Sequence, residues 1–327
     1  MANKTVDADV YVSYAERQIL ATIVITISFL GVTGNLLVIA AVILTKKLHH
    51  TTNMFVLNLS ITDLLTNIFI PFGAVAVLSE VEFPLPMILC SLTAFIFYAC
   101  FGCSINNLMC IAINRYVMII HKRATYQRLF SPKRTVVAIL LTWLIPMCFL
   151  IIPVATGFIK LGFEPEYSSC SWVKAESQPG FHLILFAAFC PLQLATIFFC
   201  YIRIFYHISS HAKKVRHLDR APSISEITSN VPEPPANRKN KLQAEVTKNL
   251  FTVVCTFFLC VAPYSFSLIL PKTEQFIPIA GVILTGNSCV NPLIYAAKHP
   301  HFRTVFRCII TMKCTEIPER SSFKCFC

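Results

Sequence analysis

The sequence contains few charged residues: Asp, Glu, Lys and Arg make up 13% of its 327 residues, against about a quarter in an average soluble domain. Hydrophobic residues instead make up 55% of the chain and gather in long runs. This shortage of charge excludes an ordinary soluble domain and indicates an integral membrane protein. The first apolar run is too long for the core of a signal peptide and follows a polar start, so we expect no cleaved signal.

Other features are missing as well, and each absence narrows the class of protein. The apolar runs lack the period-2 alternation over about 10 residues that a membrane β-barrel needs, so a barrel is excluded. No internal repeat is visible, which argues against a transporter built from inverted repeats. The apolar runs contain a single carboxylate and no histidine pair or metal-binding cluster, so we expect no enzymatic activity.

Seven apolar runs are long enough to cross a membrane as α-helices. We therefore predict an all-α membrane protein, a bundle of seven transmembrane helices within residues 19–297. Of the 28 lysines and arginines, 23 fall in connections, span ends and a tail that share one side. The positive-inside rule then predicts an N-terminus outside the cell and a C-terminus in the cytoplasm. We expect this multi-pass protein to lie in the plasma membrane. The predicted spans are about 19–45, 53–79, 88–120, 134–158, 180–209, 248–270 and 276–297.

Two polar segments lie outside these spans. Residues 1–18 form the predicted extracellular N-terminus, in which the tripeptide beginning at Asn3 is an acceptor for N-glycosylation. The stretch of about residues 211–243 is polar and rich in proline, which predicts a disordered third cytoplasmic loop.

The segment after the last span has a helical pattern of its own. Residues 298–311 alternate apolar side chains with arginines, which predicts a short amphipathic helix in the inner membrane interface. A cytoplasmic tail of residues 312–327 follows it. Cys308 and Cys314 lie near that interface and are candidates for palmitoylation.

Most of the 15 cysteines lie within the predicted spans, where they serve as small apolar residues. Cys90 and Cys170 alone fall on the predicted outer side, where oxidation occurs. We therefore predict a disulfide between them that holds the second outer loop to the top of the third span. This bond would hold Trp172 over the mouth of the bundle as a lid; alternatively, Trp172 belongs to the aromatic belt at the membrane interface.

The single carboxylate within the spans is Asp63. A carboxylate in the middle of a membrane is costly, so we expect it to face the interior of the bundle and to have a function. Neutral oxygen-bearing side chains at similar depth, including Asn35, resemble a site for a hard monovalent cation such as Na⁺. The alternative is a buried polar network around a protonated Asp63. The predicted sodium site comprises Asp63, Ser104, Asn287, Ser288 and Asn291.

The third span is expected to connect the two sides of the membrane. Phe97 and Arg115 lie five helical turns apart on one face, which corresponds to about 27 Å. This distance approaches the hydrocarbon thickness of roughly 30 Å. One helix face therefore reaches both membrane surfaces, and a signal can travel along it.

An ordered series of short motifs runs through six of the seven spans and the second outer loop. In order and in combination they resemble the rhodopsin-like (class A) G-protein-coupled receptors over about residues 19–310. Each motif alone is weak, whereas the ordered set is highly specific. The motifs are Gly34-Asn35, Leu59 to Asp63, the Cys90 and Cys170 pair, Asn114-Arg115-Tyr116, Trp143, Pro263, and Asn291-Pro292-Leu293-Ile294-Tyr295.

The resemblance implies partners and roles. The implied partners are a heterotrimeric G protein, a small-molecule ligand, the lipid bilayer, an arrestin and a receptor kinase, with no nucleic acid. Na⁺ is the one implied ion, acting allosterically, and no other cofactor is expected. G-protein coupling is assigned to Asn114, Arg115, Tyr116, Tyr201 and Tyr295. The ligand pocket is assigned to Phe97, Tyr98, Phe101, Trp172, His182, Tyr264 and Thr285.

The chain also departs from the common pattern of this family. Asn114 replaces the usual aspartate, Val261 replaces the usual tryptophan, and Gln243 stands where a glutamate often faces the arginine. Either the aromatic residue of the family is missing here, or Phe101 or Tyr264 substitutes for it. The sequence around Asn114 resembles that of melatonin receptors, which suggests an inhibitory-type G protein.

The ligand class is predicted by exclusion within the family. Phe97 stands where amine receptors have an aspartate, and Thr285 stands where opsins have the lysine that binds retinal. Pro153 and Lys174 replace polar residues expected for melatonin itself. We therefore predict a small lipophilic or aromatic ligand, with an acidic end near Lys174. The alternative is a constitutively active or ligand-less receptor that acts as a partner subunit.

Overall fold

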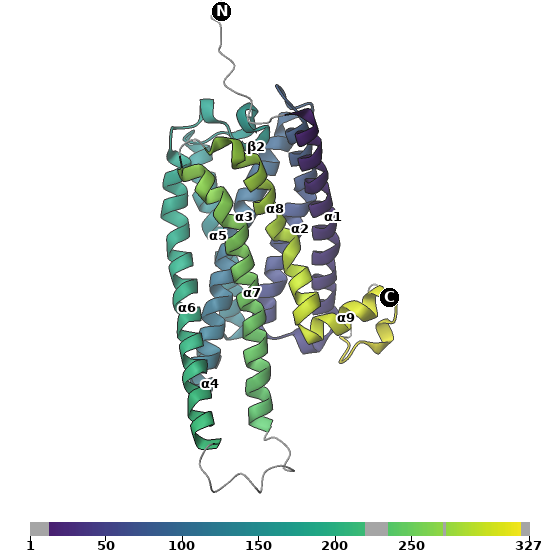
Figure 1. Ribbon diagram of the computed structural model, residues 1–327, viewed down its shortest axis with the longest axis vertical. Helices are drawn as coiled ribbons and strands as arrows, with labels where there is room; N and C mark the ends of the chain where they lie inside the picture. Colours follow the sequence, from purple (N-terminus) through teal and green to yellow (C-terminus); the bar gives the residue numbers. More distant parts are fainter. Residues whose placement is uncertain (1–12, 220–234, 271–272, 322–327) are drawn as a thin grey trace, which may run out of the picture.

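The computed structural model describes residues 13–219, 235–270 and 273–321, and its longest helices run side by side as a bundle (Figure 1). Within these residues, seven helices are long and apolar enough to cross a membrane, which confirms the predicted fold class. They are α1 (Tyr14–Leu44), α2 (Thr51–Leu78), α3 (Met87–Ile120), α5 (Pro132–Ala155), α6 (Phe181–Asp219), α7 (Pro235–Ile269) and α8 (Ile277–Lys298).

The bundle places polar side chains inside and large apolar side chains outside. Asn35 and Asn107 are fully buried, and Asp63 is 3% exposed. By contrast, Phe29 on α1 is 68% exposed and Leu140 on α5 is 61% exposed. This arrangement reverses that of a soluble protein and suits helices surrounded by lipid, whose polar groups must find partners within the bundle.

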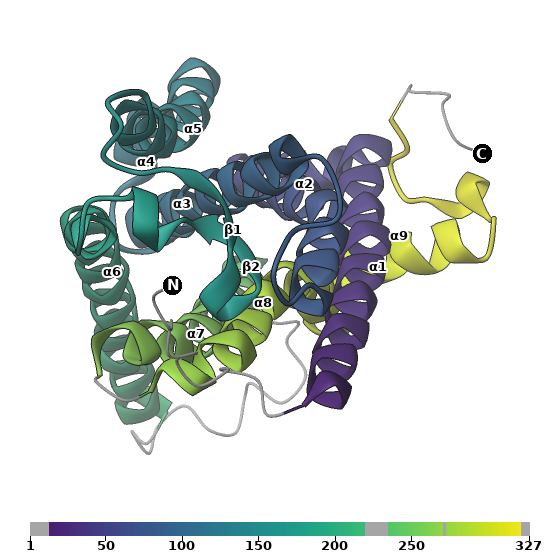
Figure 2. The same ribbon diagram turned by 90° about the horizontal axis from the view of Figure 1, so that it is seen from above.

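A short hairpin covers one end of the bundle, which we call the hairpin end. Its strands β1 (Leu161–Glu164) and β2 (Ser169–Trp172) pair antiparallel. A disulfide between Cys90 and Cys170 joins the start of α3 to β2, as predicted. Figure 2 shows the hairpin lying across the mouth of the ring of helices.

The opposite end carries the short helices α4 (Arg123–Leu129) and α9 (Pro300–Ile310), and we call it the α9 end (Figure 1). The helix α9 is amphipathic, as predicted, with Phe302 buried and Arg303 exposed. Its apolar face packs against the bundle, so Cys308 is only 8% exposed. The thiol of Cys308 is therefore inaccessible to the predicted acylation in this conformation, whereas the side chain of Cys314 lies outside the described residues.

After α9 the chain returns to the connection between α1 and α2. Residues 317–321 form this returning segment, which we call the tail strap. Thr45 and Arg320 pair in an antiparallel β-bridge, and Ile317 is 4% exposed within the main hydrophobic core. The strap thus fastens the chain beyond α9 to the α1–α2 connection.

The predicted disordered loop of residues 211–243 is too long at both ends. The helix α6 continues to Asp219, and α7 begins at Pro235. Proline is favourable at the first helical position, and the lysine, leucine, glutamine and alanine that follow are good helix formers. Residues 220–234 lie outside the described part of the chain, as does Asn3.

Candidate ligand cavity and signalling residues

The hairpin half of the bundle contains two adjoining hollows of about 150 Å³ each. The first lies among α3, α5, α6 and α7, and the second among α1, α2, α8 and the hairpin. Most of the predicted pocket residues line these two hollows. They are Phe97, Tyr98, Phe101, Trp172, Tyr264 and Thr285. The side chain of His182 lies outside the described residues.

Aromatic rings connect the lid, the cavity wall and the core beneath it. Trp172 stacks on Tyr98, with ring centroids 5.4 Å apart and planes inclined by 28°. Phe101 stacks on Phe257, with centroids 5.8 Å apart and planes inclined by 19°. Phe257 precedes Val261 by one helical turn of α7 and is 1% exposed. The Phe101–Phe257 pair therefore supplies an aromatic contact between α3 and α7 close to the place where the family has its tryptophan.

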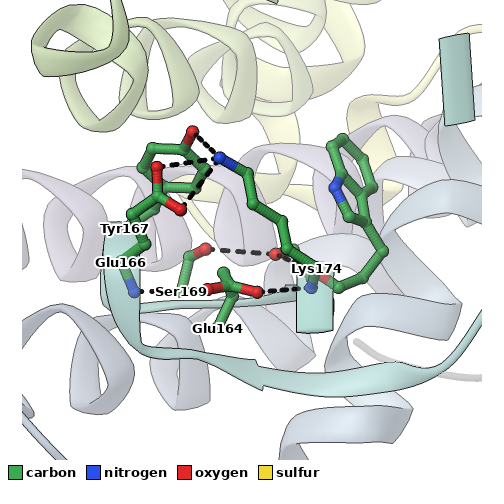
Figure 3. A network of polar contacts seen from close by, with 7 residues as sticks. Glu164, Glu166, Tyr167, Ser169 and Lys174 are labelled. Atoms are coloured by element: carbon green, nitrogen blue, oxygen red, sulfur yellow. Dashed lines mark hydrogen bonds and ion pairs between the residues drawn. The ribbon is translucent and has the colours of Figure 1, made fainter. Parts of the chain in front are cut away.

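Charged residues next to the cavity are paired within the lid. The ammonium group of Lys174 donates to both carboxylate oxygens of Glu166, at 2.8 and 2.9 Å, and to the hydroxyl of Tyr167 (Figure 3). Burial lowers the pKa of Lys174, but the hydrogen bonds to Glu166 and Tyr167 prevail and hold that pKa above its usual value. Glu166 already neutralises Lys174, so the structure disfavours the predicted acidic ligand group at this position.

A second carboxylate organises the lid from within. Glu164 is 5% exposed and accepts the backbone amides of Lys174, at 2.6 Å, and Glu166, at 3.3 Å (Figure 3). A buried cation, Arg17 on α1, donates to the hydroxyl of Ser168 at 2.6 Å. Sequence reasoning missed both contacts, because their partners lie in loops whose fold depends on the disulfide. The hairpin is thus a preformed lid, held by the disulfide and by charged hydrogen bonds.

The cluster around Asp63 brings most of the predicted sodium ligands together. The amide of Asn291 donates to the Asp63 carboxylate at 2.8 Å. The amide of Asn67 donates to the Asp63 carbonyl at 2.6 Å, and the hydroxyl of Ser288 donates to Asn67 at 3.2 Å. The hydroxyl of Ser104 instead pairs with Thr62 at 3.2 Å. We define the Asp63 cluster as Asp63, Asn35, Asn67, Asn287, Ser288 and Asn291.

Several acceptors of the Asp63 cluster are not satisfied. The side-chain carbonyl oxygens of Asn35, Asn287 and Asn291 are buried and have no hydrogen-bond partner among the described residues. Unpaired buried acceptors are rare, so each indicates a missing donor, proton or ion. One carboxylate and three carbonyl oxygens form a set of hard oxygen ligands that suits Na⁺.

The α9 end of α3 holds the residues assigned to G-protein coupling. Asn114 is fully buried; its oxygen accepts from Thr52 at 2.6 Å, and its amide donates to Tyr126 of α4 at 3.3 Å. Arg115 is 5% exposed and lies near Tyr201, which belongs with Tyr295 to the main hydrophobic core. Tyr116 instead packs its ring edge-on against His121. Asn114 thus joins α2, α3 and α4 through neutral hydrogen bonds.

A second polar cluster, which sequence reasoning missed, joins α2, α3, α5 and α6. The amide of Asn58 donates to Asn107 at 2.8 Å and to Thr142 at 3.1 Å, and its oxygen accepts from Trp143 at 2.9 Å. Paired amides in an apolar helix at positions 106 and 107 were the available signal. We define the Trp143 cluster as Asn58, Asn106, Asn107, Thr142, Trp143 and Gln193.

Comparison with known proteins identifies the family. The family described as "7 transmembrane receptor (rhodopsin family)" matches residues 34–295, which is most of the chain. The chain belongs to this family. The members of this family are receptors and not enzymes, and the same holds for this chain.

Several receptors of this family resemble the chain over most of its length. The melatonin receptor type 1B of Rattus norvegicus is 28% identical over 306 residues, which cover 89% of this chain and 78% of that receptor. The melatonin receptor type 1A of Mus musculus is 26% identical over 311 residues, covering 90% and 81%. The crystal structure of squid rhodopsin has the same fold, with a TM-score of 0.76 at 22% identity, and the match covers 94% of this chain and 89% of that one.

Proposed function

We propose that this rhodopsin-family receptor binds a small uncharged ligand in the cavity beneath the hairpin and then activates a heterotrimeric G protein at the α9 end. The hairpin end is extracellular in this proposal, because most lysines and arginines of the chain lie toward the other end. The G protein is of the inhibitory type, by analogy with the similar melatonin receptors. Arrestin and a receptor kinase are further partners on the same analogy.

The observation that carries this proposal is a chain of hydrogen bonds that runs from the cavity to Asn291, one helical turn before the coupling residue Tyr295. Thr285 lines the second hollow, and its carbonyl accepts from Ser288 at 2.8 Å. Ser288 in turn contacts Asn67, which contacts Asp63. Asp63 accepts from Asn291, one helical turn before Tyr295 on α8. A change at the cavity therefore has contiguous hydrogen-bonded groups through which to reach Asn291, next to the turn of α8 that holds Tyr295.

Ligand binding acts in this scheme by shifting the populations of two packings of the bundle. Proline residues interrupt the backbone hydrogen bonds of α7 at Pro263 and of α8 at Pro292, so both helices have places to bend. Outward movement of α7 exposes Arg115 to the G protein. Na⁺ would be held by Asp63, Asn35, Asn287 and Asn291; when bound it supplies a positive charge that stabilises the resting packing.

Nucleotide exchange provides the direct test. Receptor in lipid nanodiscs is mixed with each class of purified heterotrimeric G protein, and GTP-analogue uptake is measured with and without candidate ligands. We expect Arg115→Ala to abolish receptor-stimulated exchange while leaving thermal stabilisation by a bound ligand unchanged. Arg303→Ala, an exposed arginine of α9, is the control for loss of positive charge. Full coupling by Arg115→Ala contradicts the assigned role.

A second candidate function rests on Asn114. The family's usual aspartate carries a charge beside the arginine, whereas Asn114 is neutral and is occupied by Thr52 and Tyr126. Weaker restraint on Arg115 favours a receptor that signals without ligand. High exchange in the absence of any added ligand, lowered by Asn114→Asp, would support this alternative.

A further inference from the structure

A groove of about 460 Å³ lies on the outside of the bundle at the hairpin end, between α3, α5 and the hairpin. This volume is within the range of about 300–1,000 Å³ that is usual for small-molecule sites. Of its described lining residues, only Ile159 and Leu161 also border one of the two hollows inside the bundle. The groove is therefore a separate space that opens toward the surroundings of the helices.

The floor of the groove is apolar. Ile88, Leu92 and Phe95 of α3 form it, and their spacing places them on one face of the helix. They extend over about 10 Å of that helix, starting in its first turn. Ile88 is 65% exposed, and Val154 in the last turn of α5 is also exposed. An apolar hollow gives water no hydrogen-bond partners, so in a membrane hydrocarbon fills this floor.

The rim of the groove carries one positive and one negative side chain. Lys160 precedes β1, and Glu176 ends the short helix η3 (Lys174–Glu176). The two form an ion pair whose side chains are 58% and 51% exposed. Both lie beyond the ends of α3 and α5, which is the level of the lipid headgroups. Within the described part of the chain, no other charged side chain lines the groove.

We propose that this groove binds a zwitterionic phospholipid, of which phosphatidylcholine is the example. An acyl chain lies along the apolar floor, the headgroup phosphate pairs with Lys160, and the quaternary ammonium group pairs with Glu176. A singly charged headgroup meets a like charge at this rim, and a sterol hydroxyl matches neither charge, whereas a zwitterion meets an opposite charge at both positions. Exposed ion pairs contribute little to stability, so the headgroup displaces the existing pair at small cost.

The groove and the first hollow share a wall. Ile159 and Leu161 border both spaces, so a lipid in the groove packs against the outer side of the cavity wall. The hydroxyl of Ser91, which also lines the groove, donates to the carbonyl of Leu161 at 2.9 Å and joins α3 to β1. A bound lipid therefore supports the strand that carries the lid. This consequence for ligand binding rests on the function proposed above, whereas lipid binding rests on the groove alone.

Photolabelling tests the choice of lipid. The receptor in nonionic detergent is incubated with a trace of phosphatidylcholine that carries a diazirine in one acyl chain, and the label is mapped by peptide mass spectrometry. Phosphatidylglycerol, cholesterol and unlabelled phosphatidylcholine are the competitors. We expect label on residues 88–95, and we expect phosphatidylcholine to compete at about threefold lower concentration than the other two, the effect of one exposed ion pair. Equal competition by the three lipids overturns the proposal.

Substitutions in the floor and the rim locate the lipid. Val154→Trp fills the groove and should abolish the label on residues 88–95, whereas Ile152→Trp, at an exposed position of α5 outside the groove, should keep it. Thermal denaturation checks that both variants fold. Unchanged labelling of a folded Val154→Trp receptor contradicts the site.

The rim has its own test, which does not depend on a bulky substitution. Glu176→Gln leaves Lys160 as the lone charge and should make phosphatidylglycerol the stronger competitor. Glu82→Gln, at an exposed position of the hairpin end outside the groove, should keep the preference for phosphatidylcholine. A preference that Glu176→Gln does not change overturns the assignment of the headgroup. If labelling follows these expectations but no lipid alters nucleotide exchange, the lipid site stands and its link to the proposed function fails.

Discussion

The Trp143 cluster and the Asp63 cluster both bury polar side chains in an apolar bundle, but their hydrogen bonds are completed to different degrees. In the Trp143 cluster, Asn58 uses its amide for two bonds and its oxygen for a third. In the Asp63 cluster, three amide oxygens have no partner among the described residues. The first cluster joins four helices, whereas the second leaves acceptors available along the path from cavity to α9 end.

The difference separates structural from functional polarity in this protein. A polar group that is buried without a partner costs free energy, and this cost is severe where no water is at hand. Where the buried polar groups of a cluster are paired, their hydrogen bonds offset that cost. An incomplete cluster persists where an ion, a proton or a second packing of the helices completes it, so we propose that function belongs in the Asp63 cluster.

The largest effect is expected from Asn58→Leu. This change leaves the indole N–H of Trp143 and the side-chain oxygen of Asn107 without their partner. We expect the free energy of unfolding to fall by about 2 kcal/mol, the usual penalty for orphaned buried groups. Thermal denaturation in nanodiscs measures this loss. Thr33→Val is the control, because the hydroxyl of Thr33 is exposed and bonds only within its own helix. Equal losses of unfolding free energy for both variants would contradict the structural role of the Trp143 cluster.

Asp63→Asn, unlike Asn58→Leu, should keep the stability of the protein and change its signalling. Removing a buried charge should leave stability unchanged or raise it by about 1 kcal/mol, while the response of basal exchange to Na⁺ disappears. The assay compares sodium chloride with choline chloride at equal ionic strength. If the unmodified receptor ignores Na⁺ and Asp63→Asn destabilises as strongly as Asn58→Leu, the Asp63 cluster is structural too.

Gln193 is an exception within the Trp143 cluster and sharpens the comparison. Its amide donates to Asn106 at 3.2 Å, but its buried oxygen has no partner among the described residues. We therefore expect Gln193→Leu to change the free energy of unfolding by less than about 1 kcal/mol. Asn106→Leu should cost more, about 1–2 kcal/mol, because it strips a partner from both Gln193 and Thr142. If Gln193→Leu lowers the free energy of unfolding more than Asn106→Leu does, the unpaired oxygen of Gln193 does not reduce its contribution to stability.

The smallest effect is expected where polar groups meet water at the α9 end. Lys298 donates to the hydroxyl of Thr252 at 3.1 Å, and its carbonyl accepts from Asn249 at 2.8 Å, which ties α7 to α8. Water competes for these exposed groups, so Thr252→Val should raise basal nucleotide exchange only about twofold. Thr252→Ser keeps the acceptor and should leave the basal rate unchanged. A larger rise with Thr252→Val than with any change at Asp63 would reverse the ranking of the two regions.

The sequence allowed the seven helices and the position of Asp63 to be predicted because both depend on local composition. Apolar runs of sufficient length form helices in a membrane, and a lone acid within them must turn inward. The disulfide was also predictable, because Cys90 and Cys170 were the cysteines on the predicted outer side. These features require no knowledge of how distant segments meet.

The remaining features depend on contacts between distant segments. The pairing of Lys174 with Glu166 requires the hairpin to fold first, so a free cation at the cavity mouth was expected instead. The partners of Asn58 lie on two other helices, and the sequence pattern of α2 alone cannot identify them. Cys308 looked accessible because the packing of α9 against the bundle could not be foreseen from composition.

The tail strap pairs with the α1–α2 connection, so the lengths of these two segments must match. The amide of Lys46 donates to the carbonyl of Glu319 at 3.0 Å, and the amide of Ser321 donates to the carbonyl of Leu44 at 2.8 Å. An insertion on either side would shift this register, so natural variants should change both lengths together or neither. Truncations and affinity tags for biophysical work therefore belong after Ser321. Truncation just after Ile310 would expose an apolar surface on the isolated receptor.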